Sequence, residues 1–171
     1  MPSSDDLDSF FSPTSVAVIG ASATPGKLGH EIMKNFIGSK FSGKVYPINP
    51  KWKKILGLKA WNSILDVPEP IELAIIVTPA NVVPRILEEC VIKGVKAAII
   101  ISGGFSEIGE EGKRREREVV EIAKKANIRI IGPNCIGVFD SKTGVDTVFL
   151  PRYKLNRQEP GPIAFISQSE A

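Results

Sequence analysis

Short apolar runs alternate with amphipathic stretches along most of this chain. The runs are continuously hydrophobic, which is typical of strands covered on both faces of a sheet. The stretches between them carry apolar residues at helical spacing. Repeated strand–helix–strand units predict an α/β fold, a doubly wound, Rossmann-like parallel sheet. The predicted strands are residues 16–19, 45–48, 73–77, 97–101 and 128–131.

Local signals place helices between these strands. A helix over residues 81–93 is followed by Gly94, which suits the left-handed position after a helix. A helix over residues 110–126 is acidic at its start and lysine-rich at its end, which complements the helix dipole. Further helices are expected over residues 30–37 and around residues 7–11.

The regular pattern weakens after Val138. The following residues contain prolines, glycines and scattered charges, which indicate a loop or linker. Residues 162–166 again have the character of a strand. We therefore expect a Rossmann-like domain over residues 1–140, a linker over residues 141–161, and the first strand of a second, truncated domain within residues 162–171.

Composition excludes several classes of protein. The 171 residues are 43% hydrophobic and 24% charged, which is ordinary for a globular protein, and the net charge of +3 is too small and dispersed to indicate nucleic-acid binding. No apolar run approaches the roughly 18 residues of a membrane span, and the N-terminus lacks the apolar core of a secretory signal. Two cysteines make no disulfide framework, so we expect a cytoplasmic protein. Abundant lysine and glutamate with little glutamine hint at a thermophile.

The first predicted strand ends in a glycine-rich loop, Gly20 to Gly29. Glycines let the backbone approach a phosphate, and the first N–H groups of the following helix point at it. The glycines are spaced G-x5-G-x2-G, which is not the dinucleotide pattern G-x-G-x-x-G. A Walker A loop is also excluded, because Leu28 follows Lys27 where serine or threonine would hold magnesium. The loop predicts a nucleotide-like ligand other than plain NAD or ATP.

A cluster of glycine, proline or polar residues follows each predicted strand. Carboxyl ends of parallel strands meet at one edge of the sheet, where open α/β folds bind their ligands. Five such clusters on one edge therefore predict a binding rim. They are residues 20–29, 49–51, 78–81, 102–107 and 132–135.

The second cluster separates nucleotide classes. An NAD site usually has an acidic residue about 20 residues past the glycine loop, to bind the ribose hydroxyl. This chain has Asn49 there, followed by Lys51, Lys53 and Lys54. Lysines favour a ribose that carries a phosphate, at the 2′ position in NADP or the 3′ position in coenzyme A. We assign this role to Lys51 and interpret Lys53 and Lys54 as solvated lysines.

Six short motifs follow one another along nearly the whole chain. They are VAVIGAS (16–22) with PGKLG (25–29), VYPINPK (45–51), VTPA (77–80), ISGGFSE (101–107), IGPNCIGV (131–138) and FISQS (165–169). With them the chain resembles the CoA-binding domain of NDP-forming acyl-CoA synthetases, the family of the succinyl-CoA synthetase alpha subunit. The match is closest to the ADP-forming acetyl-CoA synthetase branch, which is often archaeal, and FISQS resembles the opening of that family's second domain.

The resemblance implies how coenzyme A or acyl-CoA would be bound, with no metal. The phosphates and adenosine would be wrapped by Ser22, Thr24, Pro25, Gly26, Lys27 and Leu28, between Gly20 and Gly29. The adenosine-phosphate end would be held by Asn49, Pro50 and Lys51. The pantetheine arm would lie along Thr78, Pro79, Ala80, Ser102, Gly103, Gly104 and Glu107. The thiol end would lie near Asn134 and Cys135.

The resemblance also implies a role in an ADP-forming acid–CoA ligase, in which acyl-CoA, ADP and phosphate give acid, CoA and ATP. That family passes the phosphoryl group through a histidine of its second domain and uses an ATP-grasp module. The chain ends before that histidine, so we expect a downstream domain or partner subunit in an oligomer to supply both. No catalytic residue is assigned here. Glu170 stands where the family has a glycine that meets phosphate, and a carboxylate would repel that phosphate.

Other residues receive simpler interpretations. The single histidine, His30, is expected at the surface or at a helix start, without a chemical role. Cys90 is expected in the core, and Cys135 is expected to be structural. Glu107 is expected to accept hydrogen bonds from backbone or ligand amides. Residues 113–117 are expected to form a solvated, ion-paired helix face.

Two other functions compete with the ligase. One is a stand-alone CoA-binding regulatory protein, which the residues resembling a second domain disfavour. The other is an NADP-dependent oxidoreductase, which the loop spacing and the lack of a Tyr-x-x-x-Lys pair disfavour. A fusion such as a protein acetyltransferase, the acyl group and the oligomeric state stay open.

Overall fold

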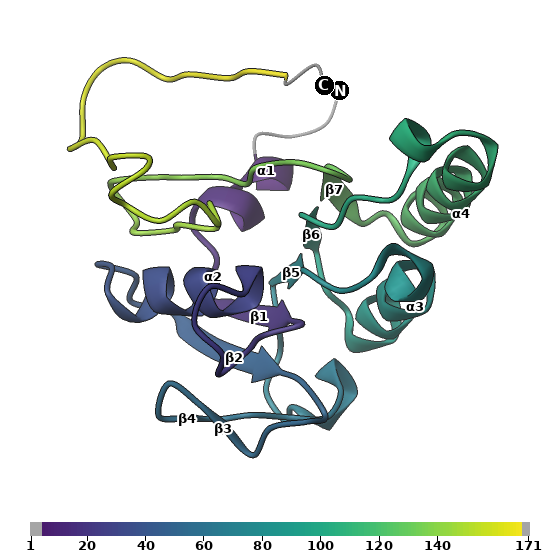
Figure 1. Cartoon of the computed structure of the whole chain (residues 1–171), viewed down its shortest axis with the longest axis horizontal. Helices are drawn as coiled ribbons and strands as arrows, with labels where there is room; N and C mark the ends of the chain where they lie inside the picture. The colour runs from purple at the N-terminus through teal and green to yellow at the C-terminus, as the bar shows by residue number, and fades with distance from the viewer. Residues whose placement is uncertain (1–4, 169–171) are drawn as a thin grey trace.

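A five-stranded parallel sheet forms the centre of the protein, in a computed structural model that describes residues 5–168 (Figure 1). The strand order is β2-β1-β5-β6-β7, and every neighbouring pair is parallel. The predicted doubly wound α/β fold is therefore confirmed. The strands are β1 (Ser15–Ile19), β2 (Lys44–Ile48), β5 (Leu73–Ile76), β6 (Ala97–Ile100) and β7 (Arg129–Ile131).

The strand order creates a switch point beside β1. The chain passes from β1 to β2 on one side and then returns to place β5 on the other side. In open α/β sheets the ligand crevice lies outside the carboxyl ends of the strands at such a reversal. Because all five strands are parallel, the five polar clusters predicted from the sequence do lie at one edge.

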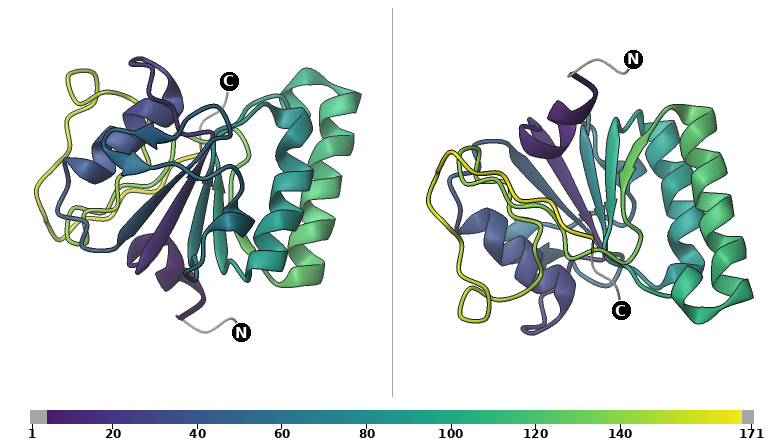
Figure 2. Two further views of the ribbon diagram at one scale, coloured as in Figure 1. Left: turned by 90° about the horizontal axis from the view of Figure 1, so that it is seen from below. Right: turned by 90° about the horizontal axis from the view of Figure 1, so that it is seen from above.

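Helices cover both faces of the sheet (Figure 2). Val16 and Val18 of β1 pack into one apolar cluster with α2 (Leu28–Ile37), while Ala17 and Ile19 pack into another with α3 (Val83–Lys93) and α4 (Glu110–Ala126). Strands that are buried on both sides explain why their sequences are continuously apolar. The helix α1 (Asp5–Phe11) contributes Phe10 to the cluster around α2.

Two helix starts differ from the prediction. α2 begins at Leu28 rather than at residue 30, so the last part of the glycine-rich motif is already helical. A short 3₁₀ helix, η2 (Ala80–Val82), precedes α3, and Pro84 lies in the first turn of α3, where its missing N–H costs no helical hydrogen bond. The predicted α4 and the left-handed Gly94 are confirmed, the latter with φ of 78°. Smaller elements are β3 (Lys54–Ile55), β4 (Leu58–Lys59), η1 (Ile64–Asp66) and η3 (Ser106–Ile108).

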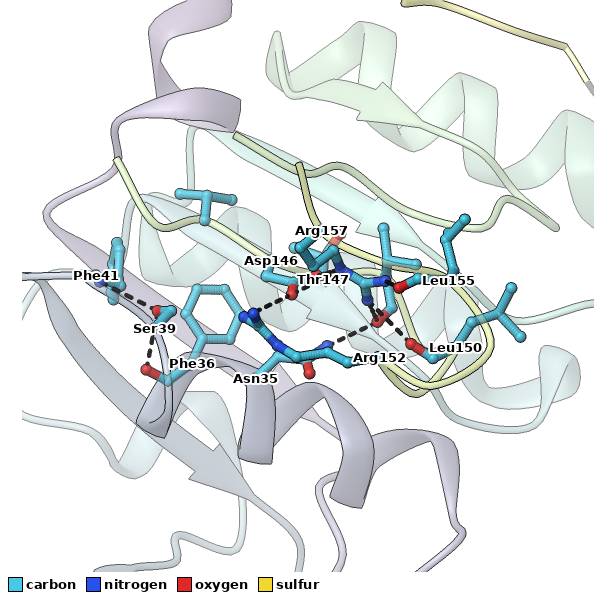
Figure 3. A network of polar contacts seen from close by, with 12 residues as sticks. Asn35, Phe36, Ser39, Phe41, Asp146, Thr147, Leu150, Arg152, Leu155 and Arg157 are labelled. Carbon is cyan, nitrogen blue, oxygen red and sulfur yellow. Dashed lines mark hydrogen bonds and ion pairs between the residues drawn. The ribbon is translucent and has the colours of Figure 1, made fainter. Parts of the chain in front are cut away.

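The segment after β7 crosses the face of the sheet that α2 covers. Val145 is fully buried there, and the Asn35 side chain of α2 donates a 2.7 Å hydrogen bond to the carbonyl of Val148. Arg157 and Asp146 form a buried ion pair that holds the segment (Figure 3). Residues expected to form a linker are therefore partly packed against α2. The division into two domains stays a prediction.

The strand predicted over residues 162–166 is wrong for this structure. The segment forms no strand and pairs with no strand among the described residues, and Ile163, Phe165 and Ile166 are 88%, 88% and 96% exposed. A strand needs a neighbour for its backbone hydrogen bonds, which apolar sequence alone does not provide. Glu170 lies outside the described residues. Among the described helices, none is long and apolar enough to cross a membrane.

Candidate functional site

The glycine-rich loop leaves β1 in close contact with two other elements. Gly20 has φ of 93°, and a Cβ atom there would lie 2.6 Å from the carbonyl oxygen of Val77, at the end of β5. A Cβ atom on Gly29 would lie only 2.1 Å from the carbonyl oxygen of Gly20. Glycine is therefore required at both positions, because the loop is enclosed between β5 and the first turn of α2.

The turn after β2 is joined to this loop by Asn49. Its Nδ2 donates a 2.8 Å hydrogen bond to the carbonyl of Ala21, and its Oδ1 accepts a 2.9 Å hydrogen bond from the N–H of Lys51. This side chain thus connects two loops and shapes the Asn-Pro-Lys turn. Lys51 is exposed on that turn, beside the glycine-rich loop.

The loop after β5 lies at the switch point. The Thr78 hydroxyl oxygen is buried, and among the described residues no hydrogen-bond partner of it is found. An unpaired buried hydroxyl is costly, and a polar ligand group can satisfy it. Ala80 lies against the next loop, because a Cβ atom on Gly104 would be 3.0 Å from the Cβ of Ala80.

Glu107 folds the loop after β6 back on itself. Its carboxylate accepts hydrogen bonds of 2.5 and 3.1 Å from the N–H groups of Gly104 and Phe105. The bond from the Gly104 N–H is the main cause that lowers the pKa of Glu107 below its ordinary value. Arg115 of α4 donates to the Gly104 carbonyl at 2.5 Å. The expectation that Glu107 accepts backbone hydrogen bonds is confirmed.

Asn134 joins the last two loops. Its N–H donates a 3.0 Å hydrogen bond to the carbonyl of Ser102, and its Oδ1 lies 3.2 Å from where a Cβ on Gly103 would be. The neighbouring Cys135 thiol donates to the carbonyl of Ile100 at 3.4 Å, and burial raises its pKa. A thiol held as a donor with a raised pKa is a poor nucleophile, in agreement with a structural role.

These contacts place five loops side by side along the carboxyl edge. The chain of contacts runs from Asn49 through the glycine-rich loop, Thr78 and Gly104 to Asn134. The sequence-predicted residues differ in burial: Gly29 and Ser102 are buried, while others are intermediate or exposed. The intermediate residues are Gly20, Ser22, Asn49, Thr78, Ala80, Gly104 and Cys135. The exposed residues are Thr24, Pro25, Gly26, Lys27, Leu28, Pro50, Lys51, Pro79, Gly103, Glu107 and Asn134.

The other local interpretations have mixed outcomes. Cys90 is fully buried in α3, as predicted, and desolvation raises its pKa to about 12. The ion pairs predicted on α4 are confirmed by Lys113–Glu110 and Arg115–Glu111, but the face is not solvated throughout, because the Arg115 side chain is only 14% exposed. Within the described residues, no group of three or more His, Cys, Asp or Glu side chains could hold a metal ion.

Of the two places expected for His30, the helix start is confirmed and the surface is not, because His30 lies in the first turn of α2 and is buried. Its exposed fraction is 8%, and its Nδ1 lies 3.2 Å from the carbonyl oxygen of Ser22 in the glycine-rich loop. Glu31 and Arg115 also contact the rim loops and were not singled out from the sequence. The contact of Glu31 could have been suspected from sequence, because Glu31 is only five residues from Gly26. The contact of Arg115 could not, because it depends on how α4 packs against the loop after β6.

Comparison with known proteins agrees with this geometry. Residues 14–140 match the sequence profile of the CoA binding domain. The chain belongs to the CoA binding domain family. It is 48% identical over 169 residues to the acetate–CoA ligase (ADP-forming) I subunit alpha of Pyrococcus furiosus, covering 96% of this chain and 36% of that subunit. This chain therefore spans about a third of the length of that relative.

Two solved structures place the domain in different contexts. An acetyl-coenzyme A synthetase of Ca. Korarchaeum cryptofilum, in complex with phosphate and ADP, is 36% identical with a TM-score of 0.82, over 86% of this chain and 32% of that one. A conserved hypothetical protein of Pyrococcus furiosus is 28% identical with a TM-score of 0.56, over 68% of this chain and 90% of that one. The CoA binding domain fold thus occurs within long chains and within chains of about its own size.

The Glu107 carboxylate gives a first testable prediction for this CoA binding domain. Its lowered pKa means that its hydrogen bonds stabilise the loop at neutral pH, and that this stabilisation is lost as pH falls from the ordinary value of 4.5 through the lower folded value. We expect the amide resonances of Gly104 and Phe105 to titrate with a midpoint below 4.5 in NMR spectra. The titration should disappear in Glu107→Gln. The titration should persist in Glu110→Gln, because the Glu110 carboxylate pairs with Lys113 rather than with the loop. A midpoint above 4.5 would contradict the prediction.

Proposed function

We propose that this chain is the coenzyme A-binding part of an ADP-forming acid–CoA ligase. The full reaction would convert acyl-CoA, ADP and phosphate into acid, CoA and ATP. The observation that carries the proposal is the Asn49 side chain, which joins the lysine-bearing turn to the glycine-rich loop. This junction suits a ligand that carries both a pyrophosphate and a ribose phosphate, and the family membership of the chain favours coenzyme A over NADP.

The rim fits coenzyme A along its whole length. The first helical hydrogen bonds of α2 are donated by the N–H groups of His30 and Glu31 to the Lys27 carbonyl. The N–H groups of Leu28 and Gly29 have no such partner among the described residues, and they suit the pyrophosphate. Lys51 would meet the 3′-phosphate of the ribose. Thr78 offers to the amide-bearing pantetheine arm a buried hydroxyl that has no partner among the described residues. The arm would continue past Gly103 and Gly104 toward Asn134.

The remaining chemistry would come from other sequence. The ATP-grasp module and the phosphorylated histidine of the ligase family would belong to a further domain or a partner subunit, and we propose a cytoplasmic oligomer. The exposed apolar side chains of Ile163, Phe165 and Ile166 support the start of a further domain, because they have no packing partner within the described residues.

A stand-alone CoA-binding protein is the second candidate. It is favoured by the match to a solved chain of about the size of this domain. The two candidates predict the same coenzyme A site but differ in catalysis. Only the ligase should form ATP from acetyl-CoA, ADP and phosphate when the complete protein is assayed.

Calorimetric titration of this chain tests the binding proposal. Coenzyme A should bind, dephospho-CoA should bind about tenfold more weakly through the loss of one charged contact, and NADP should not bind detectably. Lys51→Ala should lower the affinity for CoA to that for dephospho-CoA, because both changes remove the same ion pair. Lys53→Ala, another exposed lysine of the same turn, is the matched control and should bind CoA like the wild type.

The opposite results are also informative. A folded chain that binds NADP in preference to CoA would contradict the proposal. A folded chain that fails to bind CoA at millimolar concentration would show that this domain alone does not hold the site. Equal effects of Lys51→Ala and Lys53→Ala would overturn the specific role of Lys51.

A further inference from the structure

Three consecutive residues of α2 contact three different points of the glycine-rich loop. The backbone of Gly29 lies against Gly20, as the close approach of a Cβ there shows. The His30 Nδ1 lies 3.2 Å from the carbonyl oxygen of Ser22. The Glu31 carboxylate accepts a 3.2 Å hydrogen bond from the N–H of Gly26. The first turn of α2 therefore sets the path of the loop, not only its end.

The chemistry of the partners fixes the role of His30 in this contact. A carbonyl oxygen can only accept a hydrogen bond, so Nδ1 must carry the proton and donate it to Ser22. His30 is 8% exposed, so this hydrogen bond is partly buried and shielded from solvent on the histidine side. A buried side-chain donor that pairs with a backbone carbonyl stabilises one loop conformation over others.

The direction of the Ser22 carbonyl matters for an anionic ligand. A carbonyl oxygen turned toward a phosphate would repel it, whereas N–H groups attract it. His30 holds this oxygen on the helix side of the loop. The Ser22 hydroxyl in turn accepts the N–H of Thr24 at 3.0 Å, so the carbonyl and the side chain of Ser22 both have assigned partners.

We propose that His30 is a positioning residue for the phosphate-binding loop. It keeps the Ser22 carbonyl away from the ligand, so that the N–H groups of Leu28 and Gly29 at the start of α2 can receive the pyrophosphate without a repelling oxygen beside them. The proposal rests on the proposed coenzyme A site for its effect on binding. Its effect on the loop itself does not need a ligand.

The test compares His30→Leu with His30→Asn in the full chain. The Asn side-chain Nδ2 can replace the Nδ1 donor, whereas leucine fills the space without a donor. Without ligand, we expect faster amide hydrogen exchange at Thr24 and Gly26, whose N–H groups donate to Ser22 and Glu31, in His30→Leu, and near wild-type exchange in His30→Asn. With CoA, the dissociation constant should rise about tenfold in His30→Leu, as for one lost hydrogen bond, and should return to within about twofold in His30→Asn.

A control variant distinguishes a local change in the loop from a general loss of stability. Val119→Ala removes buried methyl groups from α4, away from the loop, and should lower the free energy of unfolding without changing CoA affinity or exchange at Thr24 and Gly26. Wild-type loop exchange in His30→Leu would overturn the proposal, and so would equal defects in the leucine and asparagine variants. A wild-type chain without CoA affinity would show that this domain alone does not hold the CoA site, while the exchange measurements would still decide the role of His30.

Discussion

Replacing Gly29 with alanine is expected to abolish CoA binding and to destabilise the fold by about 3 kcal/mol, the upper end of ordinary overpacking. The added Cβ would lie 2.1 Å from the Gly20 carbonyl oxygen and 2.9 Å from the Ala21 Cα. Both atoms belong to the backbone, so no side-chain rotation relieves the overlap. α2 would have to move away from the loop, and with it the N–H groups proposed to hold the pyrophosphate. Chemical denaturation and calorimetric titration measure the two effects.

Two other glycines serve as controls that distinguish the cost of steric overlap from the cost of backbone strain. Gly26 has φ of 80°, but no described residue lies within 4 Å of an added Cβ, so Gly26→Ala should cost only the roughly 1–2 kcal/mol of a left-handed alanine. Gly161 has no positive φ and no close neighbour among the described residues, so Gly161→Ala should leave stability and CoA affinity unchanged. The prediction fails if Gly29→Ala costs no more than Gly26→Ala.

The central sheet could be predicted well because its strands are buried on both faces. Continuous apolar runs such as residues 97–101 become strands that end within a residue or two of the prediction. The position of the rim also follows from sequence, because strand–helix–strand repeats force the strands to be parallel and bring the clusters after them to one edge. The roles of individual rim residues in binding stay predictions.

The contacts that shape the site could not be predicted from spacing. Asn35 pairs with the carbonyl of Val148, 113 residues away, and His30 reaches a carbonyl that becomes its neighbour only when the loop folds back on α2. Such bonds depend on tertiary packing, and local sequence carries no periodic signal for them. For the same reason, a polar stretch after Val138 resembles a linker although Val145 is buried.

The ion pair between Arg157 and Asp146 is expected to contribute most to holding this stretch. Arg157 Nε lies 3.0 and 2.9 Å from the two carboxylate oxygens of Asp146, and its other nitrogens donate to the carbonyls of Val148, Leu150 and Leu155 (Figure 3). The Arg157 and Asp146 side chains are 3% and 0% exposed. Removing one partner of such a pair leaves a buried charge without compensation.

Arg157→Ala should therefore lower the free energy of unfolding by about 3–5 kcal/mol. Arg152 is the matched control: it also approaches Asp146, at 3.6 Å, but it is 54% exposed, so Arg152→Ala should cost less than about 1 kcal/mol. The double variant Asp146→Ala/Arg157→Ala should be more stable than Arg157→Ala alone, because it buries no unpaired carboxylate. Since Val148 bonds to Asn35 of α2, loosening the stretch should also speed amide exchange in α2. Equal losses of unfolding free energy in Arg157→Ala and Arg152→Ala would show instead that the buried pair contributes no more to stability than an exposed one.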